Sequence, residues 1–534
     1  MPKQPNFLLF ITDQMRADHL GCYGNRVVRT SAIDAIARGG VAFDRFYVAN
    51  PACMPNRAAM VTGRMPSANG VRCNGIPLSL TANTFIDLMR LQGWQTAAVG
   101  KIHLQTMTAW PPVQRPDYGD RRAPPAGHGD ADLIDRRHPD YMQEAKARWE
   151  TDPDHDLKLP FYGFEHVDLT AMHADDVHGH YGRWLAARHP DPKSLIGRAN
   201  SLPFKGISDF QAWRTRVPEE LYSTSYIAER TEAFLRSHAA GGEGRPFLLQ
   251  CSFNDPHHPF TPPGKYFDMY DPADIELPAS FASTDDEVPP PVRLLRRLRD
   301  EGRNDREGWT IKAVAENDVR QAIALTYGAI TMIDDAIARI LRVLEETGQA
   351  EDTVIIFTSD HGDFMGDHQL ILKGPLHYDG LVRVPFIWND PQTRQRGGER
   401  SATLGSTIDI ASTILSRAGL APYHDMQGVD LAAASGPEGT GAREALLIEE
   451  DNQRAFLGFD RTVRLRTLVT DRWRFSLYRG VPWGELYDLR DDPTERHNLW
   501  DDPAARPVRD ELTARLLHTV LHLQPQSPLP VGQA

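Results

Sequence analysis

The sequence predicts an α/β protein with a large, mostly parallel or mixed sheet between helices, followed by a small antiparallel sheet and one helix. Short apolar runs predict four buried strands, at 6–11, 95–100, 246–253 and 353–359. Helical periodicity fills the segments between them, and strands that alternate with helices favour a sheet covered on both faces. From residue 441 onward, strand-like segments follow one another directly, as they do in an antiparallel sheet.

Three helices that would pack on the large sheet are predicted from hydrophobic periodicity and from residues typical of helix ends. The segment 31–40 follows the first strand region, and 83–93 begins with an Asn cap and ends at Gly93. The longest predicted helix covers 318–348 and ends at Gly348. These helices are expected to cover the faces of the sheet.

Two segments break the pattern and are interpreted as insertions, near 105–220 and 280–310. The first is rich in Pro, Gly, Asp and Arg. Such insertions build a substrate pocket or an oligomer contact, or they only lengthen the surface. We therefore divide the chain into a large α/β domain, 1–440, and a small C-terminal subdomain with a Pro-rich tail, 441–534.

The C-terminal subdomain is expected to contain consecutive strands and a closing helix. The strands are predicted at 444–450, 462–471 and 473–480, which follow one another as the strands of an antiparallel sheet do. The helix is predicted at 502–524 from its periodicity.

The composition excludes some classes of partner. The net charge of -13 over 534 residues argues against nucleic acid or an anionic membrane, although local cations can still bind a small anion. The N-terminal apolar run of about five residues is too short for a signal peptide, and no segment reaches the roughly 20 apolar residues of a membrane span. The four cysteines form no C-x-x-C pair. We expect a cytoplasmic homo-oligomer, with the insertions or the tail as candidate contacts.

Polar side chains follow each of the four predicted buried strands. In an open α/β sheet, ligands bind outside the carboxyl ends of the strands. Each residue alone has an ordinary role as a turn former or helix cap, but together they predict a metal-dependent active site. In strand order they are Asp13 and Gln14; Lys101 and His103; Asn254, Asp255, His257 and His258; and Asp360 and His361.

The residue types at these strand ends suit one kind of chemistry. Oxygen ligands with one imidazole fit a divalent cation such as calcium or manganese, and Asp13, Gln14, Asp360 and His361 offer them. Fixed cations stabilise a tetrahedral oxyanion, and the candidates are Arg57, Lys101 and Lys373. His103 and His257 can move protons near neutrality. The set describes hydrolysis of a sulfate or phosphate ester.

The segment CMPNR, 53–57, supplies a candidate nucleophile. With Thr62-Gly63-Arg64 behind it, this segment resembles the C-x-P-x-R signature of the type I, formylglycine-dependent sulfatases. The motifs GKIHL, PHHPF, SDHGDFMGDHQLILKG and ELYDLRDDPTERHNL resemble further motifs of that family, along nearly the whole chain. The resemblance implies the fold of the alkaline phosphatase superfamily, with a large mixed sheet flanked by helices and a small C-terminal antiparallel sheet plus helix.

The same resemblance implies a mechanism. A formylglycine-generating enzyme would oxidise Cys53 to Cα-formylglycine, which is hydrated to a geminal diol and lies at the metal. One hydroxyl, activated by the metal and Arg57, would attack sulfur, while His257 and Lys373 assist the leaving alkoxide. His103 would deprotonate the second hydroxyl, so that the aldehyde re-forms and sulfate leaves. A hemiacetal sulfate can collapse by C–O cleavage, which a serine sulfate cannot do.

Two residue pairs depart from the common sulfatase pattern. Many members have Asp-Asp and Asp-Asn and bind calcium, whereas this chain has Asp13-Gln14 and Asp360-His361. The imidazole shifts the metal preference toward manganese or zinc, with zinc the third candidate after calcium and manganese. These pairs resemble the phosphonate monoester hydrolase and phosphodiesterase branch, but that branch differs at Lys101 and His103. Sulfate monoesters are therefore the expected substrates, with phosphonate monoesters or phosphodiesters as the alternative.

Other polar residues are candidates for substrate binding. Asn74 either reaches the substrate oxyanion or caps a loop. His178 and His180 lie with His173 in HADDVHGHYGRW, which lines the pocket in one interpretation and binds a second metal in another. Two rival functions remain open: a catalytically silent module that binds sulfated or phosphorylated ligands, and a redox protein that uses Cys53 as a thiol.

Overall fold

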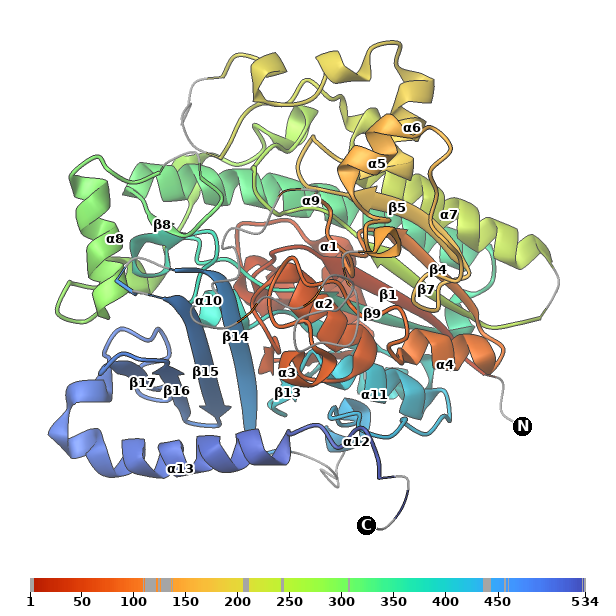
Figure 1. Cartoon of the computed structure of the whole chain (residues 1–534). Helices are drawn as coiled ribbons and strands as arrows, with labels where there is room; N and C mark the ends of the chain where they lie inside the picture. Colours follow the sequence, from red (N-terminus) through yellow and green to blue (C-terminus); the bar gives the residue numbers. More distant parts are fainter. Residues whose placement is uncertain are drawn as a thin grey trace.

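The computed structural model describes residues 4–530 and 532, except 109, 111–121, 123–124, 126–135, 137, 205–210, 242–243, 306–307, 436–442, 456–457 and 460. Parts of the first predicted insertion and the predicted boundary at 440/441 therefore lie outside the described residues. Figure 1 shows a large sheet between two layers of helices, with a smaller sheet and a long helix beside it.

The large sheet has nine strands and is mixed, which confirms the predicted fold class. Its strand order is β12-β2-β11-β9-β1-β7-β4-β5-β6. The central pairs are parallel, whereas β11 pairs in antiparallel fashion with β9 and β2. The strands are β1 (Asn6–Thr12), β2 (Val41–Phe43), β4 (Gln95–Gly100), β5 (His166–Ala171), β6 (His178–Gly179), β7 (Phe247–Ser252), β9 (Thr353–Ser359), β11 (Phe386–Asn389) and β12 (Glu399–Ser401).

Successive side chains of β1 pack into two separate cores, because side chains alternate between the faces of a sheet. Phe7, Leu9 and Ile11 pack on one side, in the core that they share with α2 (Cys53–Thr62), α4 (Phe85–Leu91) and α11 (Asp409–Arg417). Leu8 and Phe10 pack on the other side, against α1 (Ser31–Arg38), α7 (Ser223–Gly241) and α9 (Glu316–Glu346). Both faces are apolar, so the strand appears in the sequence as one continuous apolar run.

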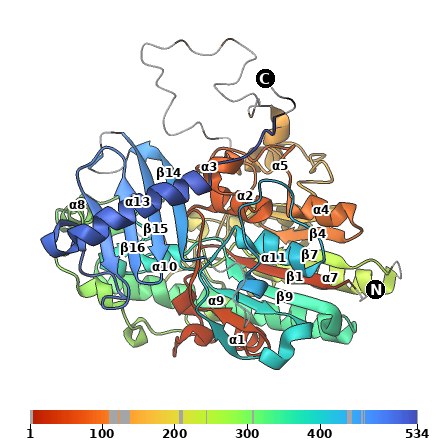
Figure 2. The ribbon, with the colours of Figure 1, turned by 90° about the horizontal axis from the view of Figure 1, so that it is seen from below.

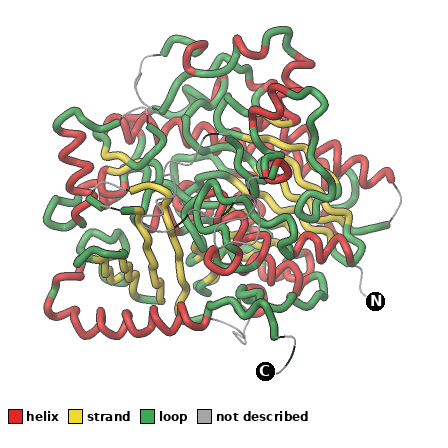
Figure 3. Tube along the Cα trace, in the orientation of Figure 1, coloured by secondary structure: helices red, strands yellow, loops and turns green. Residues whose placement is uncertain are grey.

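The helices cover these two faces as Figure 3 displays in red. The predicted helices at 31–40, 83–93 and 318–348 are confirmed as α1, α4 and α9, while α2 and α7 had not been predicted. Their bounds are α1 (Ser31–Arg38), α2 (Cys53–Thr62), α3 (Pro66–Asn69), α4 (Phe85–Leu91), α5 (Lys146–Thr151), α6 (His180–Arg188), α7 (Ser223–Gly241), α8 (Pro290–Asp300), α9 (Glu316–Glu346), α10 (Asp379–Val382), α11 (Asp409–Arg417), α12 (Leu431–Ala434) and α13 (Arg506–His522).

The C-terminal sheet is antiparallel and carries α13 across it, as seen in Figure 2. Its strands are β14 (Ala445–Ala455), β15 (Thr462–Thr470), β16 (Trp473–Tyr478) and β17 (Gly484–Asp488); the last had not been predicted as a strand. Leu512 and Leu516 of α13 pack on one face of this sheet. Leu446 and Leu465, on the other face, belong to the same core as β1, so this sheet packs against the large one.

Short strand pairs complete the described structure. They are β3 (Phe46–Tyr47) with β13 (Gly405–Ser406), and β8 (Lys312–Ala313) with β10 (Leu370–Ile371). Within the described residues, no helix is both long and apolar enough to span a bilayer.

Gly100 is the last residue of β4, and its backbone conformation and surroundings disfavour any residue that has a side chain. Its φ is 105°, and a Cβ atom there would lie 1.8 Å from the carbonyl oxygen of Ser252 on β7. We predict that Gly100→Ala costs about 2–4 kcal/mol of stability, because left-handed strain and overpacking add. The measurement is the thermal unfolding midpoint by calorimetry.

Gly93→Ala is the matched control. Gly93 has a similar φ of 102°, but a Cβ there meets no atom within 4 Å. It should cost only the conformational strain, about 1–2 kcal/mol. Equal shifts for the two variants would show that contact with β7 does not limit position 100.

Candidate active site

Four neighbouring strands deliver polar side chains to one edge of the large sheet. The strands β1, β4, β7 and β9 run parallel, so their carboxyl ends meet. Two further elements reach the same place: α2, which begins at Cys53, and the loop after β10, which carries Lys373. The residues brought together are Asp13, Gln14, Cys53, Arg57, Lys101, His103, His257, His258, Asp360, His361 and Lys373.

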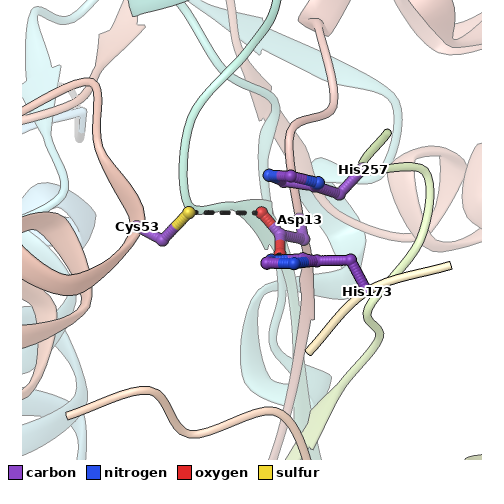
Figure 4. Close-up of side chains that lie close together, drawn as sticks. All are labelled: Asp13, Cys53, His173 and His257. Carbon is purple, nitrogen blue, oxygen red and sulfur yellow. Dashed lines mark hydrogen bonds and ion pairs between the residues drawn. The ribbon is translucent and has the colours of Figure 1, made fainter. Parts of the chain in front are cut away.

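Cys53 is almost fully enclosed, with 2% of its surface exposed. Its Sγ lies 3.1 Å from His361 Nε2, 3.1 Å from Lys373 Nζ and 3.8 Å from Asp13 Oδ1. Figure 4 shows the sulfur directed at Asp13. Burial alone would raise the pKa of this thiol, but the Lys101 and Lys373 ammonium groups hold it well below its usual value. Position 53 is therefore built to carry an anionic atom.

Arg57 lies one helical turn after Cys53, on the same side of α2. Its Nε donates to Asp360 Oδ2 at 2.7 Å, and its Nη1 donates to the Lys101 carbonyl and to Ser252 Oγ, both at 2.9 Å. Its Nη2 is buried and has no hydrogen-bond partner among the described residues. A buried, unpaired guanidinium nitrogen in this position is suited to an oxyanion.

Four side chains could hold a metal ion together. One ligand atom each from Asp13, Cys53, Asp360 and His361 lies within 4.8 Å of the others. His361 Nδ1 faces the Gly362 carbonyl at 2.8 Å, and donating its proton there leaves the Nε2 lone pair facing the cluster. Carboxylate oxygens with one imidazole fit a hard or intermediate divalent cation.

Gln14 gives an independent test of this fit. Its backbone has a positive φ of 65° and its N–H donates to Asp360 Oδ1 at 3.2 Å. Its side-chain Nε2 donates to Asp363, whereas its Oε1 is buried without a partner among the described residues. An amide oxygen left unpaired beside two buried carboxylates fits a metal ligand. Asp363, which fixes this amide, was not among the predicted site residues.

The two carboxylates of the cluster have opposite pKa shifts. Burial and the Cys53 thiolate act to raise the pKa of Asp13, but the Lys101 ammonium, together with His257 and His173, outweighs them, so this pKa lies well below its ordinary range. Burial and the neighbouring Asp13 raise the pKa of Asp360, although Arg57 opposes them. A divalent cation between the two would favour the ionised form of both.

Lys373 is held between the candidate nucleophile and an imidazole. Its Nζ lies 3.0 Å from His257 Nε2 and 3.0 Å from His361 Nε2. Since His257 Nδ1 faces the His258 carbonyl, its proton is on Nδ1 and its Nε2 accepts from Lys373. Burial, with the nearby His173 and Lys373, lowers the pKa of His257 well below its usual value. Lys373 is thus the proton-bearing partner of this pair.

A buried carboxylate shapes the loop that carries His103. Glu144 accepts hydrogen bonds from the N–H groups of His103, Leu104 and Gln105, at 2.7, 2.9 and 2.9 Å. His103 has a positive φ of 55°. Burial and the Lys101 charge lower its pKa to about 3, so its imidazole is neutral near pH 7. Glu144 was not predicted, since its segment has no strand-end signal.

The cluster opens into a cavity of about 230 Å³. Asn74 lines it and also caps α2, because its Oδ1 accepts from the Met54 N–H at 3.1 Å. Its two proposed roles are therefore compatible. The other lining residues are Pro51, Ala52, Cys53, Cys73, His103, His173, His257, His258, Trp309, Thr310, Lys373, Gly374 and 450–454 of β14.

Two predicted substrate-binding residues do not reach this cavity. His178 Nε2 lies 3.0 Å from Asp176, and His180 uses both ring nitrogens, with the Leu169 N–H and with Asp156. Neither lines the cavity. Only His173 of that segment does, so the described structure does not bring the three histidines together as a second metal site. The strand β6 and helix α6 begin at these residues, which turns their side chains elsewhere.

Comparison with known proteins finds two family models that match this chain. The family model described as Sulfatase matches residues 5–420, and the model described as N-sulphoglucosamine sulphohydrolase, C-terminal, matches residues 366–521. An arylsulfatase of Clostridium perfringens is 28% identical over 510 residues, which cover 93% of this chain and 90% of that protein. A multifunctional alkaline phosphatase superfamily protein, PehA of Trinickia caryophylli, is 28% identical over 548 residues, covering 96% and 95%.

A solved structure gives the same picture of the fold. The phosphonate monoester hydrolase of Agrobacterium radiobacter superposes with a TM-score of 0.73 and 25% identity, covering 98% of this chain and 97% of that one.

Gln14→Leu tests the proposed ligand role of the amide oxygen. We predict a loss of Mn²⁺ affinity of about 10–100-fold, because one oxygen donor and the bond to Asp363 disappear together. The measurement is titration of chelator-treated protein with Mn²⁺ by calorimetry. Gln349→Leu, which removes a buried amide bound to His238 and Leu235, should lower stability without changing the affinity. Unchanged affinity in Gln14→Leu would exclude the amide from the metal site.

Proposed function

The chain belongs to the sulfatase family, and we propose that it hydrolyses sulfate monoesters with formylglycine at position 53 and one divalent metal ion. The observation that carries the proposal is the placement of Cys53: its sulfur lies within 4 Å of Lys373, His361 and Asp13 at the base of an open cavity. That arrangement gathers a nucleophile position, cations and metal ligands around one atom.

Two groups would complete the site. Formylglycine would supply a geminal diol whose oxygens replace the Cys53 sulfur, and a divalent cation would supply positive charge to lower the pKa of the attacking hydroxyl. Asp13, Gln14, Asp360 and His361 would hold the cation together with residue 53. We propose calcium or manganese as this ion, with zinc as the third candidate. A formylglycine-generating enzyme would be the maturation partner.

Arg57 and Lys101 would stabilise negative charge in the transition state. Arg57 is fixed by Asp360, Ser252 and the Lys101 carbonyl, so its unpaired Nη2 is preorganised for an oxygen of residue 53 or of the sulfuryl group. Lys101 is completely buried and paired with Asp13, and its charge would attract the ester oxyanion. Because both side chains are already held in place, they do not have to reorient when negative charge develops in the transition state.

Lys373 would protonate or stabilise the leaving alkoxide, with His257 as its hydrogen-bond acceptor. The pKa of Lys373 is raised: burial acts to lower it, but the Cys53 thiolate and the Asp13 and Asp360 carboxylates outweigh burial. The neutral imidazole of His257 holds the amine in place through Nε2 at 3.0 Å. The pair thus places one proton beside the departing oxygen.

His103 would remove the proton from the second hydroxyl of residue 53. Its imidazole and the Cys53 side chain are close enough to affect each other's pKa, and its Nδ1 is buried without a partner among the described residues. With a pKa of about 3 it is available as a base at neutral pH. Glu144 keeps the loop in the conformation that this role requires.

Hydrolysis of phosphonate monoesters or phosphodiesters is the second candidate. Gln14 and His361 match the pairs typical of that branch, and a phosphonate monoester hydrolase is among the similar structures. Lys101 and His103 favour the sulfatase instead, because that branch differs there. The proposal also includes a cytoplasmic location and a homo-oligomer, which the composition and the insertions suggested.

The decisive experiment compares aldehyde content with activity. We predict that kcat/KM for an aryl sulfate exceeds that for an aryl phosphonate monoester, and that both rates follow the fraction of position 53 that reacts with an aldehyde probe. Cys53→Ala should lower both by about 10³-fold or more, because the nucleophile is lost. A higher rate on the phosphonate would favour the second candidate.

Cys22→Ala is the control, because Cys22 lies outside the cavity. It should keep full activity. Equal activity in preparations that contain only unmodified Cys53 would rule out formylglycine as the nucleophile.

A further inference from the structure

His173 lies against the two most enclosed charges of the site, although it comes from the first insertion. Its Nε2 is 2.8 Å from Lys101 Nζ and 3.4 Å from Asp13 Oδ2, and 10% of its side chain is exposed. Its ring stacks on that of His257, with centroids 3.8 Å apart and planes 17° apart. Figure 4 shows the two rings one above the other, beside the Asp13 carboxylate. The sequence had offered this residue only as a member of the histidine cluster HADDVHGHYGRW, and not as a partner of the strand-end residues.

The backbone around His173 is strained in order to hold it there. Met172 and Ala174, on either side, have φ angles of 75° and 56°. Both angles lie in the left-handed region, which costs residues other than glycine about 1–2 kcal/mol. Asn254, after β7, donates to the Met172 carbonyl at 2.7 Å and accepts from Thr170 Oγ at 2.6 Å. A strand-end residue of the site thus fixes the turn that delivers His173. Strain of this kind persists only where the surroundings enforce it.

The hydrogen bond to Lys101 defines the state of the imidazole. An ammonium group can only donate, so His173 Nε2 is the acceptor and the ring proton is on Nδ1. Lys101 then directs one N–H at Asp13 and one at His173, and these two hydrogen bonds fix the direction of its third N–H. The same contact places Asp13 Oδ2 on the lysine side and leaves Oδ1 toward Cys53 and His361. His173 therefore affects both the ester-binding cation and a metal ligand.

A second metal site is the obvious competing explanation. Ligand atoms of Asp13, Cys53, His173 and His257 also lie within 4.8 Å of one another. However, the Lys101 ammonium already contacts both Asp13 and His173, so a positive charge of the protein occupies the interior of this group. A further cation there would be repelled by the Lys101 ammonium, which contacts two of the four ligands.

We propose that His173 is a positioning residue of the active site: it orients the Lys101 ammonium toward the ester and the Asp13 carboxylate toward the metal. The part that concerns the ester rests on the proposed function, whereas the part that concerns Asp13 does not. Residues that orient metal ligands in this way are worth about 10–100-fold in affinity or rate.

Three variants test the proposal on the full-length, matured protein. His173→Leu keeps volume but removes the acceptor, and His173→Gln places an amide oxygen near the position of Nε2. His166→Leu, on the same strand–loop segment and outside the cavity, is the control. The measurements are Mn²⁺ affinity and stoichiometry by calorimetry, steady-state rates on an aryl sulfate and an aryl phosphonate monoester, and the unfolding midpoint.

The expected result is a loss in His173→Leu of about 10-fold in Mn²⁺ affinity and about 10–100-fold in kcat with a smaller change in KM. His173→Gln should recover most of both losses, and His166→Leu should match the wild type. Three outcomes would overturn the proposal: unchanged affinity and kcat in His173→Leu, a fall in stoichiometry from two ions to one, or equal losses in both variants with lowered unfolding midpoints. If the wild type cleaves neither ester, the proposed function fails, while the Mn²⁺ titration still tests the orientation of Asp13.

Discussion

The site depends on pairing two completely buried carboxylates with two completely or nearly buried cations of the protein. Asp13 is held by Lys101 and Asp360 by Arg57, and each pair joins residues from different elements of the sheet edge. Removing one partner of a buried pair costs about 3–5 kcal/mol, because the other charge remains in a medium of low dielectric. The carboxyl ends of β1, β4 and β9 and the start of α2 are therefore fixed relative to one another. The proposed metal ligands, the proposed nucleophile position and the proposed anion-binding cations all belong to this frame.

Much of the fold could be predicted from local sequence signals, and the reason is physical. A strand buried on both faces has to be a short apolar run, as β1 is, and polar residues directly behind it have to lie at the sheet edge. That argument found Asp13, Lys101 and Asp360. It could not find short strands such as β11 (Phe386–Asn389), whose pairing depends on partners far away in sequence. Nor could it find Glu144, since a carboxylate that binds three backbone N–H groups leaves no pattern of its own.

The two insertions provide parts of the site rather than surface alone. His173 comes from the first and Trp309 from the second, and both line the cavity. The Trp309 ring lies 5.2 Å from that of His258 and 6.2 Å from that of His173, beside a stack in which His257 is the middle ring. Buried, closely packed imidazoles favour their neutral forms, since each added charge would be poorly solvated. The sequence had left open whether these segments build the pocket, form an oligomer contact or only lengthen the surface.

One wall of the cavity is formed by β14, whose residues 450–454 come far after Cys53 along the chain. Ribosomal synthesis proceeds from the N-terminus, so every predicted ligand and cation is made before this wall exists. In a growing chain the site residues would therefore be exposed on one side. The cavity would be closed on that side only when the C-terminal sheet packs against the large sheet. The part of the cavity that would contact the alcohol portion of an ester is therefore completed last, after the proposed catalytic residues have been synthesised.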